Sequence, residues 1–296
     1  MVDSTITHPQ YSGLSLQERI KAPLVWARLT SGVRIEDLQE KRFPEALQLL
    51  REYFLTEETL CRASEISEDE ESVMGLFEIV TLWMKDLTSL IAVEEGTGEV
   101  VGLLICRVQH LLDHTRTFSR IQFIRGVAFH KIMDLRYHMH KYYDVYENYD
   151  VSQFFRIYAI CIKKTFRGQG IGMGLLYSSL NLARLMGQTV AMGVFTCLQS
   201  QRMAAKLGMV PHLEIDYAQW IKNDEIVFTD PGAGNYSIML MAMRIPNVPH
   251  ITFISEQLQE EASAKPSTSK KQRDSKTSQG SLSKKSGSIK SKNSNK

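Results

Sequence analysis

A glycine-rich run in the middle of the chain has the residue types and the setting of a phosphate-binding loop. The run, Arg167-Gly168-Gln169-Gly170-Ile171-Gly172, follows a strand-like apolar stretch at 157–162 and precedes a helical pattern from about Met173 to Met186. Closely spaced glycines at the start of a helix leave backbone N–H groups bare at the positive end of the helix dipole. Both features favour an anion, so we expect this segment to hold a phosphorylated ligand.

The known phosphate-binding motifs fit this run unequally. A P-loop ends in Gly-Lys-Ser/Thr, and no such lysine follows here. A dinucleotide fingerprint, G-x-G-x-x-G, would end on Met173 or Leu175, and 188–195 contains no acid to hold a ribose. The remaining pattern is Arg/Gln-x-x-Gly-x-Gly/Ala, with Arg167, Gly170 and Gly172 at its defined positions. A structural turn of the same composition stays open as the alternative.

The elements around the run resemble the GNAT superfamily of acetyl-CoA-dependent N-acyltransferases. After the predicted helix come a second apolar strand at 189–195 and a short helix at about 200–207 that ends in Leu207-Gly208-Met209, where the family usually has Leu-Gly-Phe. The resemblance implies an α/β (α+β) fold in which a mixed central sheet with splayed core strands is flanked by helices. It also implies acetyl-CoA as co-substrate, bound by the main chain of Ile160, Cys161 and Ile162 and by the loop from Arg167 to Gly172.

The N-terminal half resembles insect arylalkylamine N-acetyltransferases, and that likeness extends over about 33–243. A strand at 33–38 and a helix at about 44–53 lead into the acidic pair Glu57-Glu58, and Asp144-Val145-Tyr146 lies upstream of the core strand. The resemblance places the catalytic glutamate at Glu58. It places the two active-site serines at Ser200, which is retained, and at Thr196, which keeps the hydroxyl. Ala204 stands where many GNAT enzymes carry a tyrosine that acts as a general acid.

The chemistry of acyl transfer to an amine explains why a glutamate is needed. An alkylammonium with a pKa of about 10.4 must lose a proton before it attacks a thioester, and a nearby carboxylate can take that proton. Backbone donors of the core strand would polarise the thioester carbonyl. Simpler explanations stay open for each residue: Glu58 as part of a solvated acidic run, Ser200 as a helix cap and Thr196 as strand packing.

The helices and strands that must position these groups follow from periodicity. Apolar residues at helical spacing predict a helix over 72–87, and 90–94 and 100–108 flank Gly96-Thr97-Gly98 as a hairpin. Strands near 210–220 and 236–243 complete the predicted sheet. The segment 126–149 predicts one or two helices rich in histidine and tyrosine, which the insect resemblance places near the amine pocket. His138 and His140 do not share a helical face, so we expect no metal site.

Composition and charge divide the chain. Its 296 residues are 43% hydrophobic, and its four cysteines form no CxxC pair, which indicates buried reduced thiols. From residue 262 onward the chain carries nine Lys and one Arg against one Asp, a net charge of +9 in a chain of +2, and it lacks the apolar side chains that would stabilise a fold. We therefore predict an N-terminal extension at 1–30, a GNAT domain at 31–250 and a disordered basic tail at 262–296 able to contact anionic surfaces.

These observations predict an enzyme that moves an acetyl or longer acyl group from acyl-CoA to a primary amine, most simply a small arylalkylamine or polyamine, by direct attack in a ternary complex. We find neither a secretory signal at 1–10 nor an apolar run long enough to span a bilayer, so we expect a cytoplasmic protein, with nuclear entry left open. Two alternatives stay open: a lysine N-acetyltransferase that acts on proteins or peptides, and a non-catalytic acyl-CoA-binding protein of the same fold.

Overall fold

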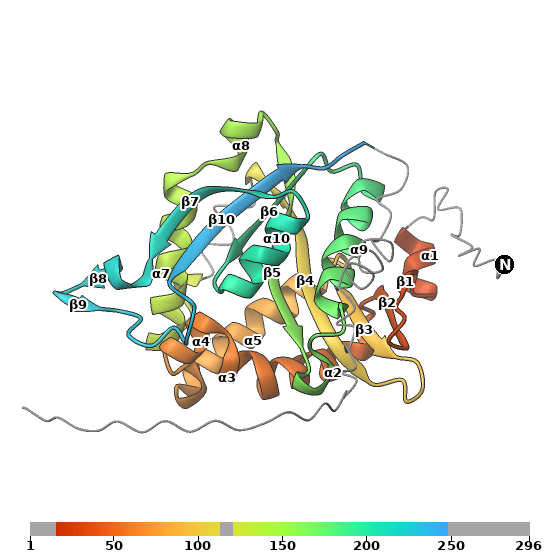
Figure 1. Ribbon diagram of the computed structural model, residues 1–296, viewed down its shortest axis with the longest axis horizontal. Coiled ribbons are helices and arrows are strands. Elements are labelled where there is room, and N and C mark those ends of the chain that lie inside the picture. Colours follow the sequence, from red (N-terminus) through yellow and green to blue (C-terminus); the bar gives the residue numbers. More distant parts are fainter. Residues whose placement is uncertain (1–15, 113–120, 248–296) are drawn as a thin grey trace, which may run out of the picture. The chain divides into compact units, whose positions relative to one another are not determined.

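A computed structural model describes residues 16–112 and 121–247 of the protein. The predicted basic tail lies outside these residues. The described chain is built on one large mixed sheet with helices on both faces (Figure 1). The sheet has eight strands in the order β1-β2-β3-β4-β5-β6-β10-β7, and β5 and β6 are its parallel pair. The predicted fold class is thereby confirmed.

The strands have the following bounds: β1 Val25–Arg28, β2 Val33–Asp37, β3 Leu90–Glu94, β4 Val100–His110, β5 Gln153–Ile162, β6 Val190–Phe195, β7 Val210–Asp216 and β10 Ser237–Arg244. The predicted hairpin, core strands and last strand are confirmed. A small separate hairpin of β8 (Ile221–Lys222) and β9 (Glu225–Ile226) was not predicted. Strand β1 falls within the segment 1–30 that the sequence sets apart as an extension, and here it is the edge of the sheet.

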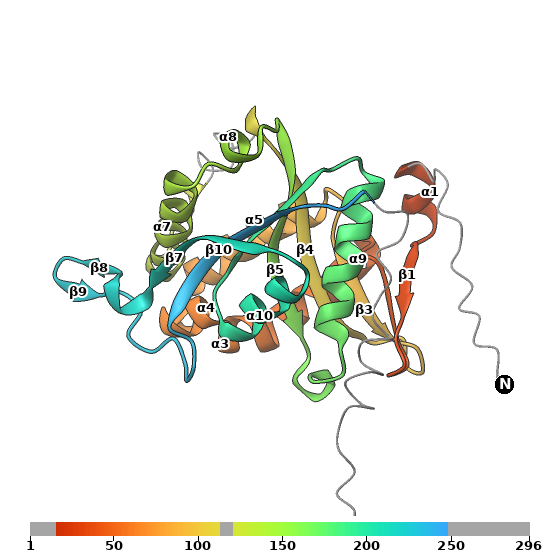
Figure 2. The same ribbon diagram turned by 45° about the horizontal axis from the view of Figure 1, so that its top comes forward.

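Helices cover the two faces of the sheet unequally. Helices α9 (Ile171–Leu185) and α10 (Leu198–Lys206) lie on one face, and α2 (Phe43–Leu49), α5 (Glu70–Met84) and α7 (Val127–Tyr142) lie on the other (Figures 1 and 2). The shorter helices are α1 Leu16–Lys21, α3 Leu55–Glu57, α4 Thr59–Ala63 and α8 Val145–Tyr149. Every residue of β6 is buried, as expected of a strand with both faces covered.

The start of α5 is tied to the start of α7 by a cap that both helices share. The Asp69 carboxylate accepts hydrogen bonds from the Ser72 N–H, at 3.1 Å, and from the Ala128 N–H, also at 3.1 Å. The Ser72 hydroxyl donates to Asp69 as well, and these bonds lower the pKa of the Asp69 carboxyl, since each favours the charged form. Gly126 precedes α7 with a φ of +111°, and a Cβ there would lie 2.3 Å from the Ser72 hydroxyl oxygen. Only glycine fits, so this contact sets where α7 begins.

The two core strands separate after a short parallel contact. Strand β5 pairs with β6 only from Phe155 to Ile157, opposite 191–193, and β6 then continues toward α10 without pairing to β5 (Figure 1). Tyr158 is an extra residue opposite β4, because Ile157 pairs with Cys106 and Ala159 with Ile105. Such a bulge bends a strand and redirects its side chains. The remainder of β5 therefore borders an opening in the sheet, as the splayed strands of the prediction require.

Candidate active site

A cleft of about 910 Å³ occupies the opening between β5 and β6. All three predicted catalytic residues, Glu58, Thr196 and Ser200, line it. Of the nine predicted cofactor-binding residues, eight line it as well: Ile160, Cys161, Ile162, Arg167, Gly168, Gly170, Ile171 and Gly172. Gln169 does not, and its side-chain amide donates to the Thr165 carbonyl at 3.4 Å. We call the region of 160–162 and 167–172 the glycine end, and the region of Glu58, Thr196 and Arg136 the glutamate end.

The glycine end presents bare backbone at the start of a long helix. Gly168 and Gly170 both have a φ of +78°, and a Cβ on either would meet nothing within 4 Å. Their conformation requires glycine, and it leaves open space beside the main chain. The bond from the Gly174 N–H to the Gly170 carbonyl, 2.9 Å, is at the start of α9. The N–H groups before Gly174 thus have no partner within the helix, as an anion site requires.

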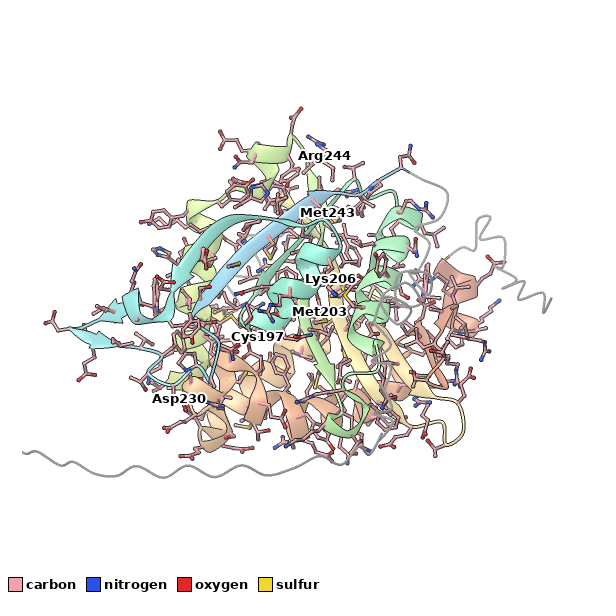
Figure 3. The ribbon with its side chains drawn as sticks, in the orientation of Figure 1. Cys197, Met203, Lys206, Asp230, Met243 and Arg244 are labelled. Atoms are coloured by element: carbon pink, nitrogen blue, oxygen red, sulfur yellow. The ribbon has the colours of Figure 1, made fainter. Side chains whose placement is uncertain are left out.

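Cationic side chains surround this end of the cleft. The Arg167 Nε donates to the Ile162 carbonyl at 3.0 Å, and its guanidinium pairs with Glu57. Arg202 and Lys206 line the cleft from α10, on which Figure 3 also places Met203, with Cys197 just before the helix. A Cβ on Gly172 would lie 3.1 Å from the Met203 sulfur, so α9 and α10 approach each other closely here.

The main chain of β5 faces the cleft at alternate residues. The Tyr158 carbonyl accepts from Arg136 at 3.0 Å, and the Ile162 carbonyl accepts from Arg167, so both carbonyls point away from β4. Because the polar groups of alternate strand residues point the same way, those of Ile160 also face the opening. An N–H donor of the core strand is thus available between the two ends of the cleft.

At the glutamate end, both oxygens of Glu58 are held by the protein. Its Oε2 accepts from the Cys61 N–H at 2.8 Å, which caps the start of α4, and its Oε1 accepts from the Thr196 hydroxyl at 2.5 Å. Tyr217 in turn donates its buried hydroxyl to the Thr196 carbonyl at 2.6 Å. Burial, followed by the negative charge of Glu58, raises the pKa of Tyr217 and of the Cys61 thiol, so both neighbours stay neutral. The carboxylate is fixed, half-buried and open to the cleft.

A smaller cavity of about 30 Å³ adjoins the cleft beyond Glu58. Phe54, Glu58, Arg136, Tyr158 and Ala159 line both spaces. The other walls of the small cavity are apolar: Leu50, Cys61, Leu76, Val80, Trp83, Phe129, Ile132 and Met133. The rings of Trp83 and Tyr158 lie 4.0 Å apart between centroids. Sequence reasoning did not find Arg136, Tyr158 or Tyr217, because no local motif marks them and each comes from a different element.

Ser200 has the capping role that the sequence allowed. Its hydroxyl donates to the Cys197 carbonyl at 2.9 Å and accepts from the Cys197 N–H at 3.4 Å, within a capping box at the start of α10. It also borders the cleft, so capping and contact with a ligand are compatible. Ala204, at the position of the missing tyrosine, is fully buried.

The histidines and tyrosines of 126–149, predicted to lie near the amine pocket, line neither the cleft nor the small cavity. His138 contacts Tyr142 and Trp220, whereas Tyr143 and Tyr149 contact His212. The α7 residues that reach the cavities are Phe129, Ile132, Met133 and Arg136. Within the described residues, no group of three or more His, Cys, Asp or Glu is placed to hold a metal ion. In the same ranges no helix is long and apolar enough to cross a membrane.

Comparisons with known proteins identify the fold. No protein-family model and no curated protein matches the chain. The structure resembles arylalkylamine N-acetyltransferase 2 from Aedes aegypti, with a TM-score of 0.68 and 23% identity over 72% of this chain and 99% of that one. An Aedes aegypti protein assigned as arylalkylamine N-acetyltransferase 7 has the same TM-score and identity, over 77% of this chain and 98% of that one.

A third similar structure is the polyamine N-acetyltransferase of Drosophila melanogaster, described as forming N-acetylagmatine. Its TM-score is 0.63 and its identity 15%, over 72% of this chain and 99% of that one. The chain thus has the GNAT acetyltransferase fold, and the predicted likeness to the insect enzymes is confirmed as a likeness of fold.

Proposed function

We propose that this protein transfers an acetyl or longer acyl group from acyl-CoA to a small primary amine, by direct attack in a ternary complex. One observation carries the proposal: a glycine loop at the start of α9 and a fixed carboxylate face the same cleft, on either side of an exposed strand edge. Acyl transfer needs these three parts together. The fold shared with insect arylalkylamine and polyamine N-acetyltransferases supports the same reaction class.

The glycine end suits the donor. Its helix N-terminus and the nearby Arg202 and Lys206 fit a pyrophosphate, and the absence of Cβ atoms at Gly168 and Gly170 lets phosphate oxygens approach the backbone. The polar groups of Ile160 and Ile162 face the opening and fit the amide-bearing arm of coenzyme A, whereas those of Cys161, which was predicted to contribute as well, face Leu103 of β4. We assign the contacts of the donor to these residues.

The glutamate end suits the chemistry of the amine. Glu58 takes one proton from the ammonium, and the freed nitrogen pair attacks the thioester carbonyl. The Ile160 N–H is placed to stabilise the charge that develops on the carbonyl oxygen. The carbon–sulfur bond then breaks, the thiolate leaves, and the second proton of the nitrogen neutralises it. Thr196 keeps the Glu58 carboxylate oriented, and Ser200 borders the end of the cleft where the sulfur departs.

The small cavity has room for only about two waters, and its apolar wall supports a small acceptor that lies at its mouth with an apolar part. Its walls include Phe54, Trp83, Phe129 and Tyr158, and its charged lining residues are Glu58 and Arg136. We therefore place arylalkylamines ahead of polyamines, because a second ammonium would find no second carboxylate there.

The test is coenzyme A release by the full-length chain, with acetyl-CoA and a longer acyl-CoA, across arylalkylamines, polyamines and lysine peptides. Turnover with a small amine is the expected result. Turnover with lysine peptides alone would transfer the assignment to a protein N-acetyltransferase. Binding of acyl-CoA without turnover on any amine would identify a non-catalytic acyl-CoA-binding protein.

A further inference from the structure

Glu58 and Arg136 line the same two cavities and yet do not pair with each other. Each is held by other groups: both Glu58 oxygens accept hydrogen bonds, from the Cys61 N–H and the Thr196 hydroxyl, and Arg136 donates to the Tyr158 carbonyl. No ion pair of Arg136 occurs among the residues that the structure describes. A fixed carboxylate and a fixed guanidinium thus face one space as two separate charges.

Arg136 has donors left for a ligand. A guanidinium carries five N–H donors in a planar fork, and among the described residues this one forms one hydrogen bond. Its side chain is half-buried on α7 and borders both the cleft and the small cavity. A planar fork of this kind matches a carboxylate, which it can bind through two parallel bonds.

A second guanidinium, that of Arg156, adds positive potential next to Tyr158, which lines both cavities. Arg156 is 5% exposed, contacts His140 and lies 4.4 Å above the centre of the Tyr158 ring. Its Nε has no hydrogen-bond partner, and within the described ranges it forms no ion pair. Burial lowers the pKa of Arg156, and the charges of Arg136 and Arg107 act in the same direction. Among the described residues, Glu58 is the one carboxylate that lines the small cavity.

We propose that the acceptor is a primary amine that also carries a carboxylate: an amino acid with an apolar or aromatic side chain. The inference rests on the proposed acyl transfer and specifies its acceptor. The ammonium lies at Glu58, the carboxylate binds Arg136, and the apolar part lies in the cleft beside Phe54 and Tyr158, at the mouth of the small cavity. The amine loses a proton to Glu58 and forms the amide as the carbon–sulfur bond breaks, and the carboxylate of the acceptor stays unchanged. A second cation, as in agmatine, would lie against Arg136 and be rejected.

The test compares amines that differ only by the carboxylate: phenylalanine with phenethylamine, tyrosine with tyramine, and leucine with isoamylamine. For the full-length chain we expect a higher kcat/KM with the amino acid of each pair. Arg136→Met keeps an unbranched, flexible side chain but removes its charge. The ratio of kcat/KM for the amino acid to kcat/KM for the matching amine should fall by about 10- to 100-fold, which is the contribution of a hydrogen bond to a charged group. Arg136→Lys should restore part of the ratio.

Controls separate this role from a structural one. Arg51→Met removes an exposed guanidinium that lies 4.9 Å above the Phe77 ring and outside both cavities, and it should leave the ratio unchanged. The affinity of Arg136→Met for acetyl-CoA reports whether the bulge at Tyr158 is intact. An unchanged ratio in Arg136→Met, or a preference for the plain amines in the unmodified protein, overturns the inference and leaves the proposed function standing. Absence of turnover with every amine, while acetyl-CoA binds, overturns both.

Discussion

The glycine end and the glutamate end of the cleft are assembled from very different lengths of chain. The glycine end uses the backbone of six consecutive residues, 167–172, together with the strand just before them. The glutamate end brings Glu58 against Thr196, 138 positions away, and adds Arg136 from α7 and Tyr217 from beyond β7. Backbone chemistry can be encoded locally because glycine spacing alone determines it. Side-chain chemistry here depends on tertiary contacts.

The neighbouring residues Glu57 and Glu58 illustrate this difference within one acidic pair. Glu57 pairs with Arg167 and belongs to the support of the glycine end, whereas Glu58 turns into the cleft and contacts Thr196. The chain leaves the helical conformation at Glu58, where ψ is 138°, so the two side chains diverge. Identical residue types therefore serve opposite ends of the cleft.

Substituting Glu57 and Glu58 one at a time is the strongest test of the different roles of the two ends of the cleft. Glu58→Gln removes the proton acceptor but keeps the side-chain size, and we expect kcat to fall by about 100- to 10,000-fold, the contribution typical of general base catalysis. Affinity for acetyl-CoA, measured by calorimetry, should change little. Glu57→Gln is the matched control: kcat should stay within a few-fold, and any change should fall on acetyl-CoA binding. Equal losses of kcat in both variants would contradict the division of roles.

A substitution in the glycine loop should have a smaller effect than Glu58→Gln, and it should change the affinity for acetyl-CoA rather than kcat. Gly170→Ala places a Cβ at a φ of +78°, which costs about 1–2 kcal/mol, so the dissociation constant for acetyl-CoA should rise by about 5- to 30-fold. Gly187→Ala imposes the same strain at a φ of +72°, after the end of α9 and outside the cleft. It should lower the free energy of unfolding and leave acetyl-CoA affinity unchanged. If the two variants bind acetyl-CoA equally well, the loop does not hold the donor.

Local patterns therefore predict the fold and the glycine end well. The strand, loop, helix, strand and helix of 153–206 have the predicted types, because each is marked by its own apolar period and by glycines at its borders. The acidic pair and Thr196 could be placed only by resemblance, and their mutual contact could not be foreseen. It depends on where the pairing of β6 with β5 ends, after Ile157.

Arg136 shows why the remainder could not be predicted. Periodicity predicts a helix over its segment, but the face that meets the cavity is fixed by the cap at Asp69 and Gly126, which sets where α7 begins. The histidines and tyrosines of the same segment stand out by residue type, yet His138 packs against Trp220 and Tyr143 against His212. Residue chemistry alone does not distinguish the two faces.

Removing the hydroxyl that orients Glu58 sharpens the comparison further. Thr196→Val keeps the shape of the side chain but deletes the donor at 2.5 Å from Glu58 Oε1. We expect kcat to fall by about tenfold, which corresponds to about 1.5 kcal/mol, the lower end of the contribution of a hydrogen bond to a charged group. Thr196→Ser retains the donor and should retain most of the activity. Steady-state kinetics at saturating acetyl-CoA measures both. If Thr196→Ser is as impaired as Thr196→Val, packing of the methyl group matters rather than the hydrogen bond.

The smallest expected effect concerns the rates at which the cysteine thiols of the unmodified protein are alkylated, because these rates report how accessible each thiol is. Burial raises the pKa of Cys161 to about 12, and its thiol lies 3.8 Å from the Leu49 carbonyl oxygen, so at pH 8 only about one thiol in 10⁴ is ionised. Burial also raises the pKa of Cys61 and Cys106, whereas Cys197 is half-buried at the start of α10.

Iodoacetamide should therefore label Cys197 first, and mass spectrometry of the digested protein identifies the site. Acetyl-CoA should slow this labelling, because Cys197 lines the cleft that we assign to the donor. A Cys197→Ser variant serves as the control and should label slowly at the three remaining sites. Labelling of Cys161 at the rate of Cys197 would mean that β5 opens away from α2 in solution. The glycine end would then be as dependent on tertiary packing as the glutamate end, and the contrast between them would fail.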